Sequence, residues 1–157
     1  MNAKPSTSVL FVCLGNICRS PLAEGVFRHV AGEAGLADRF VIDSAGTGGW
    51  HEGSLPDRRS MAVAADYGID LAGQRARKVR FDDFNRFDHI LGMDRSNVAD
   101  LRRAAPANAV ASIGLFLEVA TGDAAEIVDP YYGGPDGFET AYRTIREACE
   151  LLAAKLA

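Results

Sequence analysis

The segment VLFVCLGNICRSPLAEGVF, residues 9–27, places a cysteine and an arginine around a short turn. A thiolate is a strong nucleophile, and a guanidinium is a planar fork suited to two oxygens of a tetrahedral oxyanion. Cys13 and Arg19 are therefore candidates for attack on a phosphate group and for binding it. A second cysteine, Cys18, raises the alternatives of a metal site, a disulfide and a redox switch.

The five residues between Cys13 and Arg19 suit a loop that binds an anion: Leu14, Gly15, Asn16, Ile17 and Cys18. Glycine adopts positive φ freely and asparagine tolerates it, so such a turn can aim successive N–H groups at one point. With the N-terminus of a following helix it forms an anion site that also favours the thiolate form of Cys13. Ser20 can hydrogen-bond the sulfur and ease its departure from a thiophosphate.

A phosphate ester also needs its leaving oxygen protonated, and the segment VDPYYGGPDGFE offers Asp129 for this step. Pro130 holds Asp129 in extended backbone on a stiffened loop. Tyr131 and Tyr132 follow as aromatic neighbours. Asp94 is the rival acid, although its context, DRSN, is typical of the turn that begins a helix.

Several other classes of site are disfavoured. The CxxxxC spacing lacks a second ligand pair for zinc, and His29, His51 and His89 are scattered along the chain. No GxxxxGK motif for nucleotide occurs. The net charge of -4 argues against a general affinity for nucleic acid or an anionic membrane. With no 18-residue apolar run and an odd number of cysteines, we expect a cytoplasmic protein with reduced thiols.

Apolar runs alternate with helical patterns along the chain. Strands are expected over 8–13 and 39–46 and within the runs 87–94 and 109–117. Helices are expected over 20–35, 57–68, 96–105 and a final C-terminal segment. The final helix carries an apolar stripe of Phe138, Tyr142, Ile145, Cys149, Leu152 and Leu156, on which Cys149 is a packed thiol. The alternation predicts one α/β domain over 1–157 with a parallel sheet.

Ligands of such sheets bind at the carboxyl ends of the strands, where Cys13, Ser44 and Asp94 fall. The basic cluster Arg75, Arg77, Lys78 and Arg80 is interpreted as a solvated face. A basic rim that attracts phosphorylated or acidic substrates is the alternative.

The motifs CLGNICRS (13–20) and DPYYG (129–133) resemble those of the low-molecular-weight protein tyrosine phosphatase family. The resemblance extends over essentially the whole chain and includes GMDRSN (92–97). It implies a four-stranded parallel sheet flanked by helices on both faces, a flavodoxin- or Rossmann-like three-layer sandwich. It implies no metal and no organic cofactor. The expected reaction is hydrolysis of protein phosphotyrosine and small aryl phosphates through a phosphocysteine intermediate.

By this resemblance Cys13 is the nucleophile, Arg19 binds phosphate and stabilises the transition state, and Asp129 is general acid and then base. The phosphate-binding residues would be those of the loop, together with Ser20. The resemblance also places Cys18 across the turn from Cys13, which suggests a reversible protective disulfide.

The resemblance implies further support and a shaped cleft. Asn16, Ser20 and Ser44 match a hydrogen-bond network that holds the loop, and Gln74 stands where the family often has a histidine. Trp50 matches an aromatic wall of the cleft, with Tyr131 and Tyr132 opposite. A deep slot with aromatic walls favours phosphotyrosine over phosphoserine.

Four alternatives stay open. Arginine phosphatases of the same family typically carry threonine at the position of Ile17, and arsenate reductases use additional cysteines, of which residues 70–100 have none. A cysteine-phosphorylated phosphocarrier uses a similar loop but needs no acid at Asp129. A redox sensor built on Cys13 and Cys18 is the non-enzymatic alternative. The expected partner is a tyrosine-phosphorylated protein, with a bacterial tyrosine kinase as one candidate.

Overall fold

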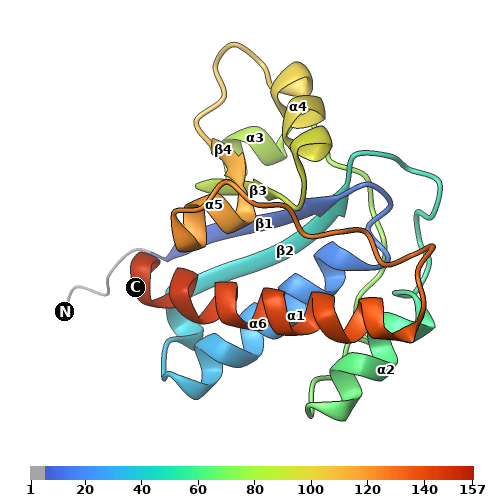
Figure 1. Cartoon of the computed structure of the whole chain (residues 1–157). Coiled ribbons are helices and arrows are strands. Elements are labelled where there is room, and N and C mark those ends of the chain that lie inside the picture. Colours follow the sequence, from blue (N-terminus) through green and yellow to red (C-terminus); the bar gives the residue numbers. More distant parts are fainter. Residues whose placement is uncertain (1–5) are drawn as a thin grey trace.

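The computed structural model describes residues 6–157 and has the expected alternation of strands and helices (Figure 1). The strands are β1 (Thr7–Cys13), β2 (Phe40–Gly46), β3 (His89–Gly92) and β4 (Ser112–Leu115). The helices are α1 (Arg19–Glu33), α2 (Arg58–Asp66), α3 (Asp83–Arg86), α4 (Arg95–Ala104), α5 (Phe116–Thr121) and α6 (Pro135–Leu156), with a 3₁₀ turn, η1 (Ala37–Arg39), before β2.

The four strands form one parallel sheet in the order β2-β1-β3-β4, which confirms the expected sheet. The central strand β1 pairs with β2 on one side and β3 on the other. At its carboxyl end Cys13 lies beside Gly46, and Val12 lies beside Gly92. The order is that of flavodoxin-like folds, in which ligands bind where the chain leaves neighbouring strands in opposite directions.

Two apolar cores cover the two faces of the sheet. Alternate residues of a strand point to opposite faces. Val9 and Phe11 belong to a large core with α1, α2, α5 and α6, whereas Leu10 and Val12 belong to a smaller core with α3 and α4. Figure 1 shows α1 and α6 on one side of the sheet and α3 and α4 on the other, so the three-layer arrangement is confirmed.

The C-terminal helix α6 packs along α1 with the predicted stripe. Phe138, Tyr142, Ile145, Cys149 and Leu152 are buried, and Leu156 packs against the same core. The prediction of Cys149 as a packed thiol is confirmed, and burial raises the pKa of this thiol well above its usual value.

Two element boundaries differ from the sequence-based expectation. The run 109–117 contains the fourth strand, as expected, but the strand is limited to Ser112–Leu115, and Phe116 begins α5. A short apolar run fits a buried helix as well as a strand, and Phe116 is fully buried. The segment 122–137 is expected to be a long loop, but the last helix begins within it at Pro135, because proline suits the first helical turn, where no N–H partner is needed.

The interpretation of the basic cluster as a solvated face is wrong for one member. Arg77 is mostly buried and forms ion pairs with Asp83 at 2.9 Å and Asp43 at 3.1 Å. Arg75, Lys78 and Arg80 are exposed.

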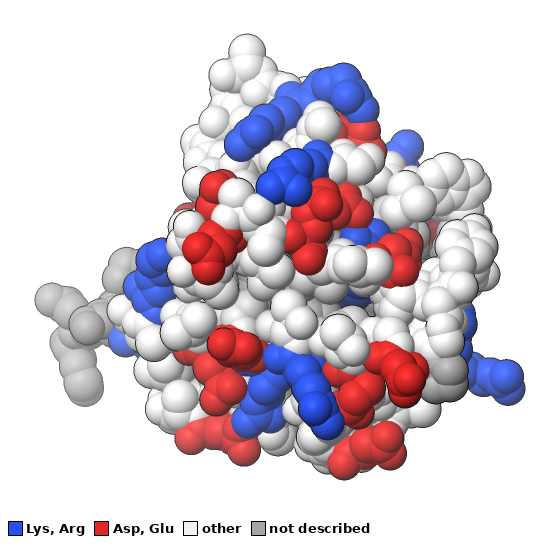
Figure 2. Space-filling model, in the orientation of Figure 1, with Lys and Arg blue, Asp and Glu red and all other residues white. Residues whose placement is uncertain are grey.

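On the face viewed in Figure 2, acidic and basic side chains are interspersed. Within residues 6–157, no helix is long and apolar enough to cross a membrane.

Candidate active site

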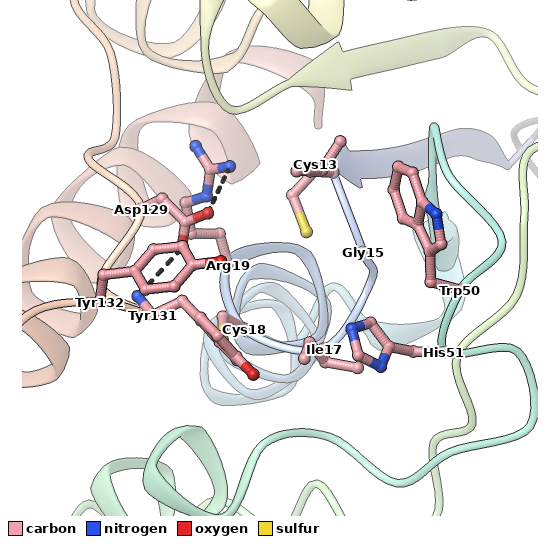
Figure 3. Close-up of a pocket in the computed structure, with 11 residues that line it drawn as sticks. Cys13, Gly15, Ile17, Cys18, Arg19, Trp50, His51, Asp129, Tyr131 and Tyr132 are labelled. Carbon is pink, nitrogen blue, oxygen red and sulfur yellow. Dashed lines mark hydrogen bonds and ion pairs between the residues drawn. The ribbon is translucent and has the colours of Figure 1, made fainter.

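A pocket of about 150 Å³ opens at the carboxyl end of β1, where the loop of residues 14–18 leads into α1 (Figure 3). The residues that line it come from this loop, from the segment after β2 and from the segment before α6: Cys13, Leu14, Gly15, Ile17, Cys18, Arg19, Trp50, His51, Asp129, Tyr131 and Tyr132. The structure therefore brings together the predicted nucleophile, arginine and acid, although more than a hundred residues separate the acid from the other two.

The loop of residues 14–18, called here the phosphate loop, is held from outside through its carbonyl groups. Gly48 N–H donates to Leu14 O at 2.9 Å, and Asp57 N–H donates to Ile17 O at 2.8 Å. Ser60 Oγ donates to Cys18 O at 3.2 Å. The N–H groups of residues 14–18 have no hydrogen-bond partner within the described chain. A loop with fixed carbonyls and unpaired N–H groups at a helix N-terminus is suited to an anion.

Asn16 fixes the shape of the phosphate loop. It has a positive φ of 56°, which asparagine tolerates better than most residues. Its buried amide donates to Ser20 Oγ at 2.8 Å and Ser44 Oγ at 3.0 Å, and its Oδ1 accepts the N–H of Arg77 at 2.9 Å. All the polar atoms of this side chain are therefore engaged, and the loop is tied to β2 and to the segment before α3.

Gly15 differs from the expectation, because positive φ falls on Asn16 and not on Gly15. A Cβ at Gly15 would lie 3.0 Å from Cδ2 of His51. The glycine therefore makes room for the His51 ring at the wall of the pocket.

Arg19 is buried beneath the pocket, and its charge is balanced by two carboxylates. Its Nη1 donates to Asp94 Oδ2 at 2.7 Å and to Ile127 O at 2.9 Å. Its Nη2 lies 3.5 Å from Asp129 Oδ2. Arg19 Nε is buried without a partner among the described residues, so this donor of the guanidinium remains for a ligand.

Asp94 was expected to begin a helix, and it does, but it also holds Arg19. Its side chain caps α4 by accepting the N–H of Asn97 at 2.8 Å, in a reciprocal capping box. Sequence reasoning missed the contact with Arg19. The signal was its position at the carboxyl end of β3, which adjoins β1 in the sheet.

Aromatic side chains form opposite walls of the pocket (Figure 3). Trp50 is 72% exposed and stands on one side, while Tyr131 and Tyr132 stand on the other. The Tyr131 and Tyr132 rings pack edge to face, with 4.9 Å between their centroids. His51 also lines the pocket and was missed, although it adjoins Trp50 in the glycine-rich segment.

Four of the predicted residues lie outside the residues that line the pocket: Asn16, Ser20, Ser44 and Gln74. Asn16 and Ser20 were predicted both to bind phosphate and to support the loop; their side chains are buried, and they form the loop-supporting hydrogen bonds. Gln74 does not join Asn16, Ser20 and Ser44; its Nε2 donates to Pro21 O at 2.9 Å. Glu24 takes part in this network instead, accepting the Ser44 hydroxyl at 2.7 Å, because α1 turns it toward β2.

The three cysteines are free thiols with different surroundings. Cys13 and Cys18 line the pocket, whereas Cys149 lies in the core. Burial, together with nearby Asp57, raises the pKa of Cys18 to about 12, so its thiol stays protonated at neutral pH.

A parallel α/β sheet, with a thiol, an arginine and a carboxyl around an anion loop at the end of its central strand, defines a cysteine-dependent phosphatase. Residues 8–157 match the family model described as low molecular weight phosphotyrosine protein phosphatase. The chain belongs to this family, and it is a hydrolase that acts as a protein-tyrosine phosphatase.

Individual proteins also match this chain over most of its length. The low molecular weight phosphotyrosine protein phosphatase of Schizosaccharomyces pombe is 51% identical over 136 residues, covering 85% of this chain and 86% of the relative. A crystal structure of the Entamoeba histolytica protein tyrosine phosphatase, with Hepes in the active site, superposes with a TM-score of 0.89 at 39% identity, covering 96% and 97% of the two chains. The Drosophila arginine phosphatase superposes with a TM-score of 0.86 at 33% identity, covering 94% and 96%.

Proposed function

We propose that Cys13, Arg19 and Asp129 carry the phosphatase reaction. The observation behind this assignment is that the thiol, the guanidinium and the carboxyl line a single pocket. The phosphate binds with its oxygens on the N–H groups of residues 14–18 and on Arg19, below the aromatic walls. The Cys13 thiolate attacks phosphorus in line and forms a phosphocysteine. Asp129 donates its proton to the departing phenolate oxygen, and the Asp129 carboxylate results.

In the second step Asp129 acts as a base. Its carboxylate takes a proton from water, which attacks the phosphocysteine and releases phosphate. The sulfur leaves as a thiolate and receives the hydrogen bond of Ser20. The phosphate loop and Arg19 hold the oxygens through both steps, so most of the rate enhancement comes from positioning and charge stabilisation.

The substrate class we propose is a protein that carries phosphotyrosine. Trp50 and Tyr131 stand on opposite sides of the pocket, which suits a flat aryl ring between them, and Ile17 adds an apolar side chain to the lining. Phosphoarginine is the second candidate, because an arginine phosphatase is among the structural neighbours. A bacterial tyrosine kinase is a candidate partner where the source is a bacterium.

The test compares phosphotyrosine, phosphoserine and phosphoarginine peptides, with para-nitrophenyl phosphate as a general substrate. We expect phosphotyrosine to have the highest kcat/KM and Cys13→Ser to abolish turnover of every substrate. Cys149→Ser, in the core, controls for loss of a thiol elsewhere. Turnover that survives Cys13→Ser contradicts the mechanism, and a preference for phosphoarginine contradicts the substrate class.

We further propose that the chain acts as one cytoplasmic phosphatase domain with a redox switch. The odd number of cysteines, three, supports a reducing compartment. Peroxide would oxidise the Cys13 thiolate to a sulfenic acid. The Cys18 thiol would then attack the sulfenic sulfur, and its proton would leave with the hydroxyl group as water, forming a disulfide. Peptide mapping after peroxide treatment tests this switch. Inactivation without a bond between Cys13 and Cys18 contradicts it.

A further inference from the structure

The first turn of α2 contacts both the phosphate loop and the segment that carries Asp129. Asp57, the N-cap residue of α2, donates its own N–H to Ile17 O of the phosphate loop at 2.8 Å. Its carboxylate accepts Arg59 Nε at 3.0 Å and Arg59 Nη2 at 3.0 Å, a forked pair. The Arg59 guanidinium is therefore fixed relative to the phosphate loop.

The remaining nitrogen of Arg59 contacts residues 127–134, the segment that carries Asp129 and is called here the acid segment. Its Nη1 donates to Tyr131 O at 3.0 Å. The guanidinium carbon lies 5.3 Å from the centroid of the Tyr131 ring and 4.5 Å from that of Phe138 in α6. Tyr131 in turn donates its N–H to Asp129 Oδ1 at 3.1 Å. A continuous series of contacts thus runs from the phosphate loop to the acid.

The acid segment has few other attachments. On the N-terminal side of Asp129, Ile127 is anchored by its N–H to Met93 O at 2.9 Å and by its carbonyl to Arg19. Between Asp129 and α6, the bond from Arg59 is the only hydrogen bond that joins the described residues to another part of the chain. Removing it leaves that side of the acid segment held by side-chain packing alone.

We propose that Arg59 is a positioning residue that fixes Asp129 over the leaving oxygen by clamping Tyr131 to the phosphate loop. Arg59 does not itself contact the phosphate site, since it is absent from the residues that line the pocket. This role rests on the proposed function of Asp129 as the general acid. Proton transfer needs the acid within hydrogen-bond reach of the leaving oxygen, so a small displacement slows it.

Two substrates with different leaving groups distinguish a role of Arg59 in positioning the acid from a general structural role. A phenol of high pKa, such as tyrosine at about 10, needs the proton more than an acidic nitrophenol does. We expect Arg59→Gln to lower kcat/KM for phosphotyrosine roughly tenfold, a fraction of the full contribution of a general acid, and to leave para-nitrophenyl phosphate within about threefold. Arg59→Lys keeps the charge without the fork and should fall between Arg59→Gln and the wild type.

The matched control is Arg58→Gln. Arg58 lies in the same first turn, is exposed and forms no hydrogen bond or ion pair with the described residues, so its loss should change neither substrate. Thermal unfolding of each variant checks that the fold is kept.

A double-mutant cycle with Asp129→Ala decides the proposal. If Arg59 acts through the acid, Arg59→Gln has no further effect on phosphotyrosine turnover once Asp129 is alanine. Equal losses on both substrates, or additive losses in the double variant, overturn the role of Arg59. An Asp129→Ala variant that turns over phosphotyrosine like the wild type overturns instead the proposed function of Asp129.

Discussion

Ser20 Oγ lies 3.1 Å from Cys13 Sγ, and the direction of the hydrogen bond between them follows from a third group. The Asn16 amide nitrogen, which can only donate, lies 2.8 Å from the same Ser20 oxygen. The hydroxyl therefore accepts from Asn16, and its own hydrogen has two acceptors within reach, Cys13 Sγ at 3.1 Å and Ala45 O at 3.4 Å. The sulfur is the nearer of the two, so we assign the hydrogen to it. Such a bond stabilises a thiolate more than a neutral thiol, both before attack and when the sulfur leaves.

Removal of this hydroxyl should slow the second chemical step most. We expect Ser20→Ala to lower kcat roughly 10- to 100-fold, because a hydrogen bond to a charged group contributes about 1.5–3 kcal/mol. Phosphocysteine should accumulate, which appears as a larger burst of phenol in rapid-mixing experiments. An exposed serine in β4, Ser112→Ala, is the control. A variant with unchanged kcat and no accumulated intermediate would contradict the assigned bond.

The ion pair between Arg19 and Asp94 should be important for stability as well as for binding. Asp94→Asn keeps an oxygen to cap α4 but removes the charge that faces Arg19, whose side chain is 3% exposed. Loss of one partner of a largely buried pair costs up to about 3 kcal/mol here, less than for a fully buried pair because Asp94 is partly exposed. Urea unfolding measures this loss. A midpoint equal to that of the wild type contradicts it.

The two cysteines of the pocket should react differently with alkylating agents. Because burial and Asp57 raise the pKa of Cys18 to about 12, that thiol remains protonated and slow at pH values near neutrality. We expect iodoacetamide to modify Cys13 first, and inorganic phosphate to protect it. Cys149 should react only after unfolding. Mass mapping of the modified peptides is the measurement, and modification of Cys18 at the rate of Cys13 contradicts the expectation.

The buried carboxyl of Glu24 predicts a pH dependence of stability with a definite sign. Burial raises the pKa of Glu24 above its usual value of 4.5, so the folded protein holds this proton more tightly than the unfolded chain. The contribution of Glu24 to the free energy of unfolding therefore falls as the pH rises from the unfolded pKa through the raised folded pKa, and is constant above it. Glu24→Gln has no carboxyl to titrate. The free energy of unfolding of the variant should therefore rise relative to that of the wild type as the pH increases from the unfolded pKa through the raised folded pKa of Glu24.

Denaturant unfolding over that pH range tests the sign. Glu147→Gln, on the exposed side of α6, is the control and should follow the wild type. A difference between Glu24→Gln and the wild type that stays constant, or moves in favour of the wild type with rising pH, contradicts the prediction.

The sequence predicted the sheet and the pocket because their signals are local. A buried strand that ends at Cys13, and a proline-initiated helix that begins beside Arg19, place an anion loop at a strand end whatever surrounds it. Asn16 is an example of a residue whose type alone suggested its positive φ, which the structure confirms. Asp129 was predicted from its chemistry, since the reaction needs a second group that carries a proton, and the structure places it in the lining of the same pocket.

The missed residues are those whose roles depend on contacts between distant segments. Asp94 and Arg19 meet only because β3 lies beside β1 in the sheet. No sequence pattern pointed to Glu24, whose carboxylate meets the Ser44 hydroxyl only because α1 packs against β2. Arg77, predicted to be solvated, is buried because Asp83 and Asp43 converge on it from two elements. The spacing of residues along the chain does not indicate which of these distant side chains meet in the folded protein.

The most direct test of the account is to trap the covalent intermediate. Asp129→Ala should still accept phosphate from para-nitrophenyl phosphate, whose leaving group needs little protonation, but should hydrolyse the phosphoenzyme slowly. Rapid acid quench followed by peptide mapping is expected to find the phosphate on Cys13, and to find none in the double variant Cys13→Ser, Asp129→Ala. Phosphate on another residue, or turnover with no phosphoenzyme on Cys13, would contradict the mechanism.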